Sequence, residues 1–168
     1  MYEFDRTSYD RCMAWWLHDR FGMFIHFGAY AIPARGEWVR STERLTIEQY
    51  EPYVREFNPR AFDARAWARA AREAGMRYMV LTAKHHDGFC LFDSALTDYK
   101  STNTPFGRDL VAEYVEAARA EGLRVGLYFS LIDWHHPDFP QHGDRHAPLR
   151  DEPRAGSNEG RDWGRYLA

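Results

Sequence analysis

Histidines and an aspartate follow closely on an apolar run over residues 78–83 of this chain. They are His85, His86 and Asp87, side chains that can bind hydroxyls, transfer protons or ligate a metal ion. Apolar runs that end in such groups are typical of β/α barrels, where side chains at the carboxyl ends of the strands form the active site. Two more runs end in a similar way, residues 21–25 at His26 and residues 125–130 before Asp133, His135 and His136.

Adjacent side chains on a strand point to opposite faces, so His85 and His86 can reach one ligand only where the strand ends. A neutral imidazole offers one donor and one acceptor, which matches a sugar hydroxyl that both gives and receives a hydrogen bond. We therefore expect at least one of the two histidines to face a ligand. The alternative is that one of them caps a loop or binds a buried carbonyl. Asp87 is expected to fix a loop or a tautomer rather than to act directly.

The segment after the first run adds three candidates of different chemistry. His26 is either a ligand-facing group or a core histidine whose nitrogens are satisfied within the protein. Glu37 and Trp38 follow a glycine in the loop beyond. The carboxylate could accept hydrogen bonds from sugar hydroxyls while the indole covers an apolar face of the ring. A solvated loop glutamate is the plainer alternative.

Asp133, His135 and His136 raise the question of a metal site. Histidines and aspartates at barrel strand ends bind divalent ions in metal-dependent hydrolases. The spacing is unlike H-x-H or H-E-x-x-H, and neighbouring histidines rarely ligate one ion together. We expect no metal and no cofactor, with a metal-dependent barrel hydrolase kept as the less favoured alternative.

Composition indicates one globular domain. The 168 residues are 45% hydrophobic and 28% charged, and the aromatic share of 16% suits either a core or a carbohydrate site. A net charge of -3 gives no basic surface for nucleic acid, and no apolar run is long enough to span a membrane. No signal peptide is visible at the N-terminus, which predicts a cytoplasmic protein. Cys12 and Cys90 are expected to be buried free thiols.

Helical periodicity separates the apolar runs. We predict strands over residues 22–27, 78–83 and 124–130, and alternating helices imply that the strands are parallel with right-handed crossovers. A doubly wound sheet is the competing layout, but the first strand lacks the G-x-G-x-x-G turn of a dinucleotide site. The fold class is therefore α/β, with about three βα units of a barrel that has eight.

The predicted helices have sequence signals at their ends. Thr46 and Gln49 form a capping-box pattern, and Asp63 and Asp109 are candidate N-caps. For the helix after Asp63 we expect a buried stripe of Trp67, Ala70, Ala71 and Ala74. The remaining segments are a helix over residues 7–20, loops over 28–41 and 137–160, and the start of a helix after residue 160.

Four motifs together resemble the α-L-fucosidases of glycoside hydrolase family 29. In that family's order they are residues 21–28, Gly36-Glu37-Trp38, residues 84–89, and residues 126–130 followed by Asp133-Trp134. The resemblance implies a catalytic (β/α)8-like barrel followed by a C-terminal β-sandwich. It also implies removal of terminal α-L-fucose from a fucosylated glycan or fucoside, with retention of configuration and without a metal.

The matched motifs imply roles for individual residues. His26, Glu37, Trp38, His85 and His86 resemble the family's fucose-binding residues, and Tyr128 resembles the tyrosine near its nucleophile. Val39 departs from the tyrosine that often follows Glu-Trp, so the resemblance does not predict which side chain forms that edge of the pocket.

The resemblance also implies where the catalytic carboxyl groups lie. The family's nucleophile is an aspartate after a fourth strand, and its acid/base lies further on, so both are expected beyond Ala168. Residues 1–168 would then be the N-terminal portion of the catalytic barrel, truncated and inactive alone. The alternative is a non-catalytic fragment with at most weak sugar binding.

Overall fold

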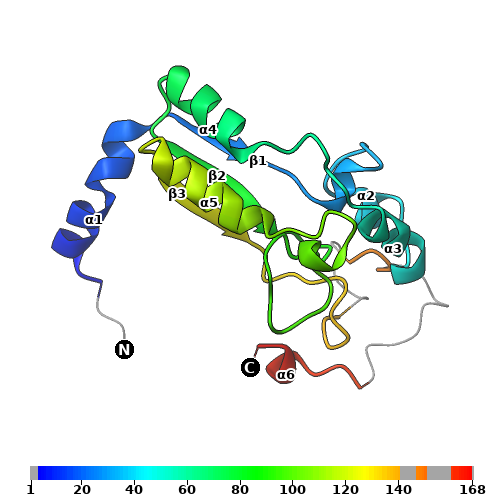
Figure 1. Ribbon diagram of the computed structural model, residues 1–168. Coiled ribbons are helices and arrows are strands. Elements are labelled where there is room, and N and C mark those ends of the chain that lie inside the picture. Colours follow the sequence, from blue (N-terminus) through cyan, green and yellow to red (C-terminus); the bar gives the residue numbers. More distant parts are fainter. Residues whose placement is uncertain (1–3, 141–146, 151–159, 168) are drawn as a thin grey trace.

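The computed structural model describes residues 4–140, 147–150 and 160–167. Its centre is a parallel sheet of three strands in the order β1 (Gly22–Ile25), β2 (Tyr78–Lys84) and β3 (Arg124–Phe129) (Figure 1). The sequence prediction of an α/β fold with parallel strands is confirmed. Because the three strands run in one direction, their carboxyl ends lie at one edge of the sheet.

Two helices cover one face of this sheet, α4 (Ala64–Glu73) and α5 (Leu110–Ala120) (Figure 1). Asp63 and Asp109 cap them as predicted, each accepting a hydrogen bond from the backbone N–H three residues on. Between helices and sheet lies the core, which includes Met79 and Leu81 of β2.

The predicted stripe of α4 is partly wrong. Ala64, Ala68 and Ala71 are the buried residues of the helix, whereas Ala70 and Ala74 are exposed. An alanine-rich helix offers apolar positions at several phases, so its sequence pattern alone does not choose which face contacts the sheet. Packing against α5 and β2 determines which face of α4 is buried.

The opposite face of the sheet has no helix over it among the described elements (Figure 1). Phe24 of β1 points to that face and is 54% exposed. β3 is an edge strand, and its Phe129 is 52% exposed although it lies on the helix-covered side. Both strands therefore present apolar surface of a kind that parallel sheets normally cover.

Short helices surround the carboxyl edge of the sheet. Residues 28–41 are not the plain loop that the sequence predicted, because η1 (Ala29–Ala31) and the start of α2 (Val39–Thr42) lie within them. α3 (Ile47–Arg55) begins with the predicted capping box, and η2 (Ser101–Asn103) follows β2. The loops between these short helices lie next to the carboxyl ends of the strands.

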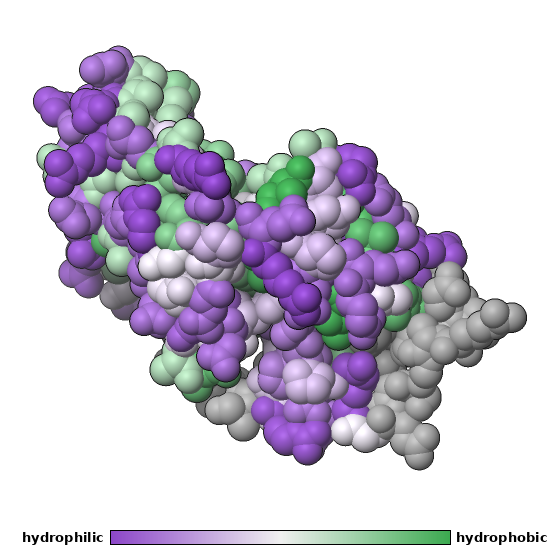
Figure 2. All heavy atoms as spheres, turned by 45° about the vertical axis from the view of Figure 1, so that its right-hand side comes forward, coloured by the Kyte–Doolittle hydropathy of each residue, from purple (hydrophilic) through white to green (hydrophobic). Residues whose placement is uncertain are grey.

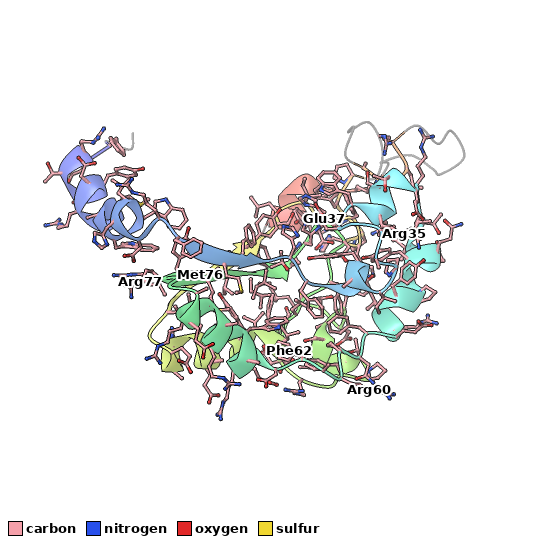
Figure 3. The ribbon with its side chains drawn as sticks, turned by 90° about the horizontal axis from the view of Figure 1, so that it is seen from above. Arg35, Glu37, Arg60, Phe62, Met76 and Arg77 are labelled. Carbon is pink, nitrogen blue, oxygen red and sulfur yellow. The ribbon has the colours of Figure 1, made fainter. Side chains whose placement is uncertain are left out.

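The terminal helices differ in how they attach. α1 (Arg6–Asp19) has no buried residue and lies at the amino end of the sheet, where Trp15 and Trp16 contact the ring of Tyr78 (Figures 1 and 3). Cys12 on α1 is exposed while Cys90 is buried, so the prediction of two buried thiols is wrong for Cys12. α6 (Trp163–Leu167) confirms a helix after residue 160, whereas most of the predicted loop 137–160 lies outside the described residues.

The surface drawn in Figure 2 is mainly hydrophilic, with hydrophobic residues in smaller separate patches. No helix in the described ranges is long and apolar enough to cross a lipid bilayer.

Candidate functional site

A threonine side chain ends the pairing between β1 and β2. The backbone register runs to Ile25 opposite Leu81. Beyond it, the Thr82 hydroxyl accepts from the Phe27 N–H at 3.0 Å and donates to the Phe27 carbonyl at 2.7 Å. β1 is therefore two residues shorter than predicted, because a side chain bonds the groups that a strand would pair. His26 lies where β1 leaves the sheet.

A β-bulge interrupts the pairing between β2 and β3 just before its last pair. Thr82 pairs with Tyr128, but the next partner of β3, Phe129, pairs with Lys84 rather than with Ala83. One extra residue in β2 bends the strand and changes the direction of the side chains that follow. The strict alternation of faces is broken just before His85 and His86, which allows the two neighbours to join one cluster.

Histidine and tyrosine rings from all three strand ends form that cluster. The His85 ring centroid lies 5.3 Å from His26 and 4.2 Å from His86. Tyr128 stacks on His85 at 5.8 Å and lies 6.1 Å from His26. His85 and His86 are buried, Tyr128 is half-buried and His26 is exposed. The structure thus brings together four predicted site residues at the carboxyl edge of the sheet.

Trp38 forms a wall beside His86. Its ring centroid lies 4.8 Å from the His86 ring and 5.5 Å from the ring of Trp134, both in edge-on geometry. The backbone N–H of Trp134 donates to the His86 carbonyl at 2.7 Å. Two indoles therefore enclose His86, one from the loop after β1 and one from the loop after β3.

Glu37 adjoins the cluster through Tyr30. The Tyr30 ring lies 5.3 Å from His85, and burial, followed by the charges of Asp87 and Glu37, raises the pKa of its hydroxyl. Figure 3 shows Glu37 at the carboxyl end of the sheet, opposite the end marked by Met76 and Arg77. The predicted carboxylate is half-buried on the side where the histidines lie.

His85 is neutral, and one of its two ring nitrogens makes no hydrogen bond among the described residues. Burial, then its neighbours His86, His26 and Lys84, lower its pKa from 6.5 to about 3. Its buried Nδ1 has no hydrogen-bond partner among the described residues. Buried polar atoms are normally paired, so this nitrogen is an exception, in a ring that adjoins the exposed His26.

Asp87 acts within its own loop, as the sequence predicted. It accepts a hydrogen bond from the Tyr50 hydroxyl at 2.7 Å and another from the Phe89 N–H at 3.2 Å. The residue is 1% exposed, and burial raises the pKa of its carboxyl group. Arg40 is buried nearby against the Tyr50 ring. The carboxyl group therefore fixes α3 to the turn after β2.

Asp133 also has a structural set of contacts. It accepts from Lys84 Nζ at 2.9 Å and from the backbone N–H groups of His135 and His136 at 3.0 and 2.9 Å. His135 stacks on Tyr99 with ring centroids 3.7 Å apart. In the ranges that the structure describes, no three His, Cys, Asp or Glu side chains are grouped so that they could hold a metal ion.

Sequence reasoning missed several residues that hold the cluster. Tyr30 and Thr82 share a hydrogen bond of 3.2 Å behind His26 and His85. Ser130 lies 2.6 Å from His86 Nδ1. Tyr30 and Thr82 stand in none of the four motifs, and Ser130 ends the motif of residues 126–130 without having been named as a site residue. Thr82 and Ser130 do occupy strand ends, and this position was the signal that could have included them.

Comparisons with known proteins agree with this arrangement. A family model described as Alpha-L-fucosidase matches residues 1–154. Tissue alpha-L-fucosidase from Rattus norvegicus is 36% identical over an alignment of 140 residues, and the match covers 73% of this chain and 30% of the relative.

Two solved structures are similar as well. Alpha-L-fucosidase isoenzyme 1 from Paenibacillus thiaminolyticus has a TM-score of 0.89 and 62% identity, over 94% of this chain and 37% of that one. An alpha-L-fucosidase of family GH29 from Bacteroides thetaiotaomicron, trapped as a covalent intermediate with 2-fluoro-fucosyl fluoride, has a TM-score of 0.76 and 36% identity. It is matched over 89% of this chain and 36% of its own length.

The chain thus spans about a third of the length of the relatives that it matches. The sequence motifs, the ring cluster at the strand ends and the family match over most of the residues lead to one conclusion. This chain belongs to the alpha-L-fucosidase family, glycoside hydrolase family 29.

Proposed function

We propose that these residues bind fucose in an α-L-fucosidase that releases terminal α-L-fucose from a fucosylated glycan or fucoside with retention of configuration. The observation that carries the proposal is the cluster that neutral His85 forms with His26, His86 and Tyr128 at the carboxyl edge of the sheet. Imidazole and phenol groups supply both donors and acceptors within the span of one monosaccharide.

The roles follow from burial and chemistry. The neutral imidazole of His85 would exchange one hydrogen bond with a sugar hydroxyl, and the exposed His26 would meet a second hydroxyl. Glu37 would accept hydrogen bonds from hydroxyls, since a carboxylate has only acceptors. Trp38 would cover an apolar C–H face of the ring. Family membership and the fluoro-fucosyl complex of the Bacteroides relative support fucose as the sugar.

The reaction itself requires two carboxyl groups about 5 Å apart, one as nucleophile and one as acid/base. Asp87 and Asp133 are already engaged by Tyr50 and Lys84. We propose that both catalytic carboxyl groups come from outside residues 1–168 and that these residues form the N-terminal portion of a (β/α)8 barrel. The covalent intermediate in the Bacteroides relative supports retention.

The proposal is tested in a chimera. The matching segment of the Paenibacillus thiaminolyticus enzyme, which is 62% identical, is replaced by this chain, and hydrolysis of an aryl α-L-fucoside is measured. We expect hydrolysis, and we expect H85A to lower kcat/KM by about 10- to 100-fold, the effect of one buried hydrogen bond of ~1.5–3 kcal/mol.

H18A is the matched control, because His18 is an exposed histidine on α1, outside the cluster. Its activity should equal that of the unsubstituted chimera. A folded chimera that leaves the fucoside intact would contradict the proposal and favour the non-catalytic alternative. Equal activity of H85A and H18A would contradict the role of His85.

A further inference from the structure

The buried hydroxyl of Thr82 is a junction between β2 and the chain that leaves β1. Its oxygen lies 3.0 Å from the backbone nitrogen of Phe27 and 2.7 Å from the carbonyl oxygen of the same residue. The hydroxyl oxygen of Tyr30 lies 3.2 Å away. Thr82 is 1% exposed and Tyr30 is 5% exposed, so solvent does not compete for these contacts.

Counting protons gives the direction of each bond. A threonine hydroxyl has a single proton to donate and two lone pairs, and a carbonyl oxygen can only accept. The contact of 2.7 Å between two oxygens therefore requires that Thr82 donates to the Phe27 carbonyl. Its lone pairs then accept from the Phe27 N–H and from the Tyr30 hydroxyl, so Tyr30 is the donor in the third contact.

A second carbonyl is too distant to change this direction. The carbonyl oxygen of Ile25 lies 3.5 Å from the Thr82 hydroxyl, beyond the range of about 2.5–3.0 Å that is usual for O–H···O bonds. The proton of Thr82 therefore goes to Phe27. With one proton given and two received, the hydroxyl has used its full hydrogen-bonding capacity.

A glycine allows Tyr30 to approach this junction. A Cβ built on Gly28 would lie 2.7 Å from Cε1 of the Tyr30 ring, whereas carbon atoms pack best at about 3.5–4.0 Å. The ring is thus held against the chain, with its centroid 6.3 Å from that of His26 and 5.3 Å from that of His85. The turn after His26 is packed too tightly to admit a side chain at position 28.

His26 consequently stands between two fixed residues. On one side, Ile25 is the last residue of β1 and pairs with Leu81 in the sheet. On the other side, both polar backbone groups of Phe27 are bound by the Thr82 side chain. The sheet alone would hold only the first of these neighbours, so the direction in which the chain leaves β1 depends on one hydroxyl.

We propose that Thr82 is a positioning residue that, with Tyr30 as its hydrogen-bond donor, fixes the backbone of His26 and so determines where that imidazole meets the sugar. Thr82 acts through His26 and does not itself touch the sugar. The contact between His26 and a sugar rests on the proposed function, whereas the effect of Thr82 on the position of His26 does not.

The position of His26 is measured by NMR on protein labelled with ¹³C,¹⁵N-histidine and expressed from its complete reading frame. The His26 ring lies 5.1 Å from Phe24 and 6.1 Å from Tyr128, so the ring currents of these neighbours make its chemical shifts sensitive to displacement. The signals that vanish in H26Q assign His26. T82V keeps the shape of the side chain without the hydroxyl, and it should displace these signals.

T82S retains the hydroxyl and should keep the His26 signals close to their natural positions. T104V is the matched control, because the Thr104 hydroxyl also donates to a backbone carbonyl at 2.7 Å, that of Ser101, outside the ring cluster. T82A removes the same hydroxyl and repeats the measurement should T82V fail to fold. Unchanged His26 signals in a folded T82V or T82A protein, or an equal displacement in T104V, would overturn the inference.

The inhibition constant of free α-L-fucose tests the consequence for binding. T82V should weaken fucose binding about 10-fold, with T82S close to the natural protein and T104V unchanged. Because Thr82 acts through His26, the double variant H26A/T82V should bind fucose as H26A does. Losses that multiply in the double variant would show that Thr82 acts by another route and would contradict its role.

The two measurements separate this inference from the proposed function. If the His26 signals move in T82V but the natural protein does not bind fucose, the proposed function fails and the role of Thr82 stands. If fucose binds and the His26 signals do not move, the role of Thr82 fails and the proposed function stands.

Discussion

At the scale of single residues, burial decides the charge of the site. His85 lies between two other histidines, and within the described ranges the charged groups that act on it are His86, His26 and Lys84, none of them acidic. Desolvation and like charges both disfavour the imidazolium, which lowers its pKa to about 3. The ring is therefore neutral over the physiological pH range, and it can exchange hydrogen bonds with hydroxyl groups without changing its charge.

This neutrality predicts a dependence of stability on pH. The unfolded chain binds a proton on His85 below pH 6.5, whereas the folded protein resists it down to about pH 3. The His85 contribution to the free energy of unfolding is thus present above pH 6.5 and falls by about 1.4 kcal/mol per pH unit as the pH decreases towards 3. The measurement is urea unfolding between pH 4 and 8 on protein from the complete reading frame.

H85N is the comparison, because it keeps a polar side chain and removes the titration. Below pH 6.5 its unfolding free energy should fall less steeply with decreasing pH than that of the natural protein. Above pH 6.5 the two curves should run parallel. Parallel curves over the whole range would show that His85 is not buried as a neutral ring.

At the scale of elements, two turns are locked together at the carboxyl edge of the sheet. The turn after β2 contains Gly88, whose φ of +85° favours glycine. A Cβ built there would lie 2.3 Å from Asp133 Oδ1, the atom that accepts from the loop after β3. The absence of a side chain lets the Lys84–Asp133 ion pair form directly over the turn.

We expect G88A to lower the free energy of unfolding by about 3 kcal/mol, roughly 1 from the left-handed backbone and ~2 from the clash with Asp133. The matched control is G107A. Gly107 also has a positive φ, +63°, but its nearest neighbour to a built Cβ is the Thr104 carbonyl at 3.9 Å.

G107A should therefore lower the free energy of unfolding by only about 1 kcal/mol, the cost of the left-handed backbone conformation. Urea unfolding monitored by circular dichroism measures both variants. Equal losses in the two would mean that the contact between Gly88 and Asp133 contributes nothing, and the turns would then be held by other bonds.

At the scale of the whole molecule, the sheet has more apolar surface than its described helices cover. Phe24 is more than half exposed on the open face, and Leu127 and Phe129 are about half exposed along the edge strand. Phe129 also lines a hollow with Leu131 and Phe92. Full burial of such a side chain contributes about 1.5–3 kcal/mol, so each half-exposed one forgoes roughly 1 kcal/mol, against a total of ~5–15 kcal/mol for a typical domain.

Residues 1–168 produced by themselves should therefore fold poorly and leave an aryl α-L-fucoside intact. We expect a broad thermal transition and strong binding of a hydrophobic dye such as ANS. The chimera with the Paenibacillus thiaminolyticus enzyme is the positive control for both measurements. Turnover by the 168 residues equal to that of the chimera would place the reaction centre within them, and Glu37 and Asp133 would then be the first carboxylates to replace.

The sequence by itself determined the local elements and the chemical character of the site. Capping residues such as Asp63 and Asp109 predicted where helices begin, because an N-cap bonds backbone only three residues away. Apolar runs predicted the three strands, and the histidines after them predicted a shared edge. The family motifs predicted membership, which the comparisons confirm. The roles assigned to the site residues stay predictions.

Only the tertiary structure decided how the site is held. The bond from Ser130 to His86 spans 44 residues, and the bond from Tyr30 to Thr82 spans 52. The buried face of α4 and the bulge in β2 likewise depend on neighbouring elements. Local sequence patterns report forces between residues that are near in the chain. The contact between His86 and Ser130, the unpaired Nδ1 of His85 and the burial of both histidines depend on groups that meet only after folding, so no local pattern contains them.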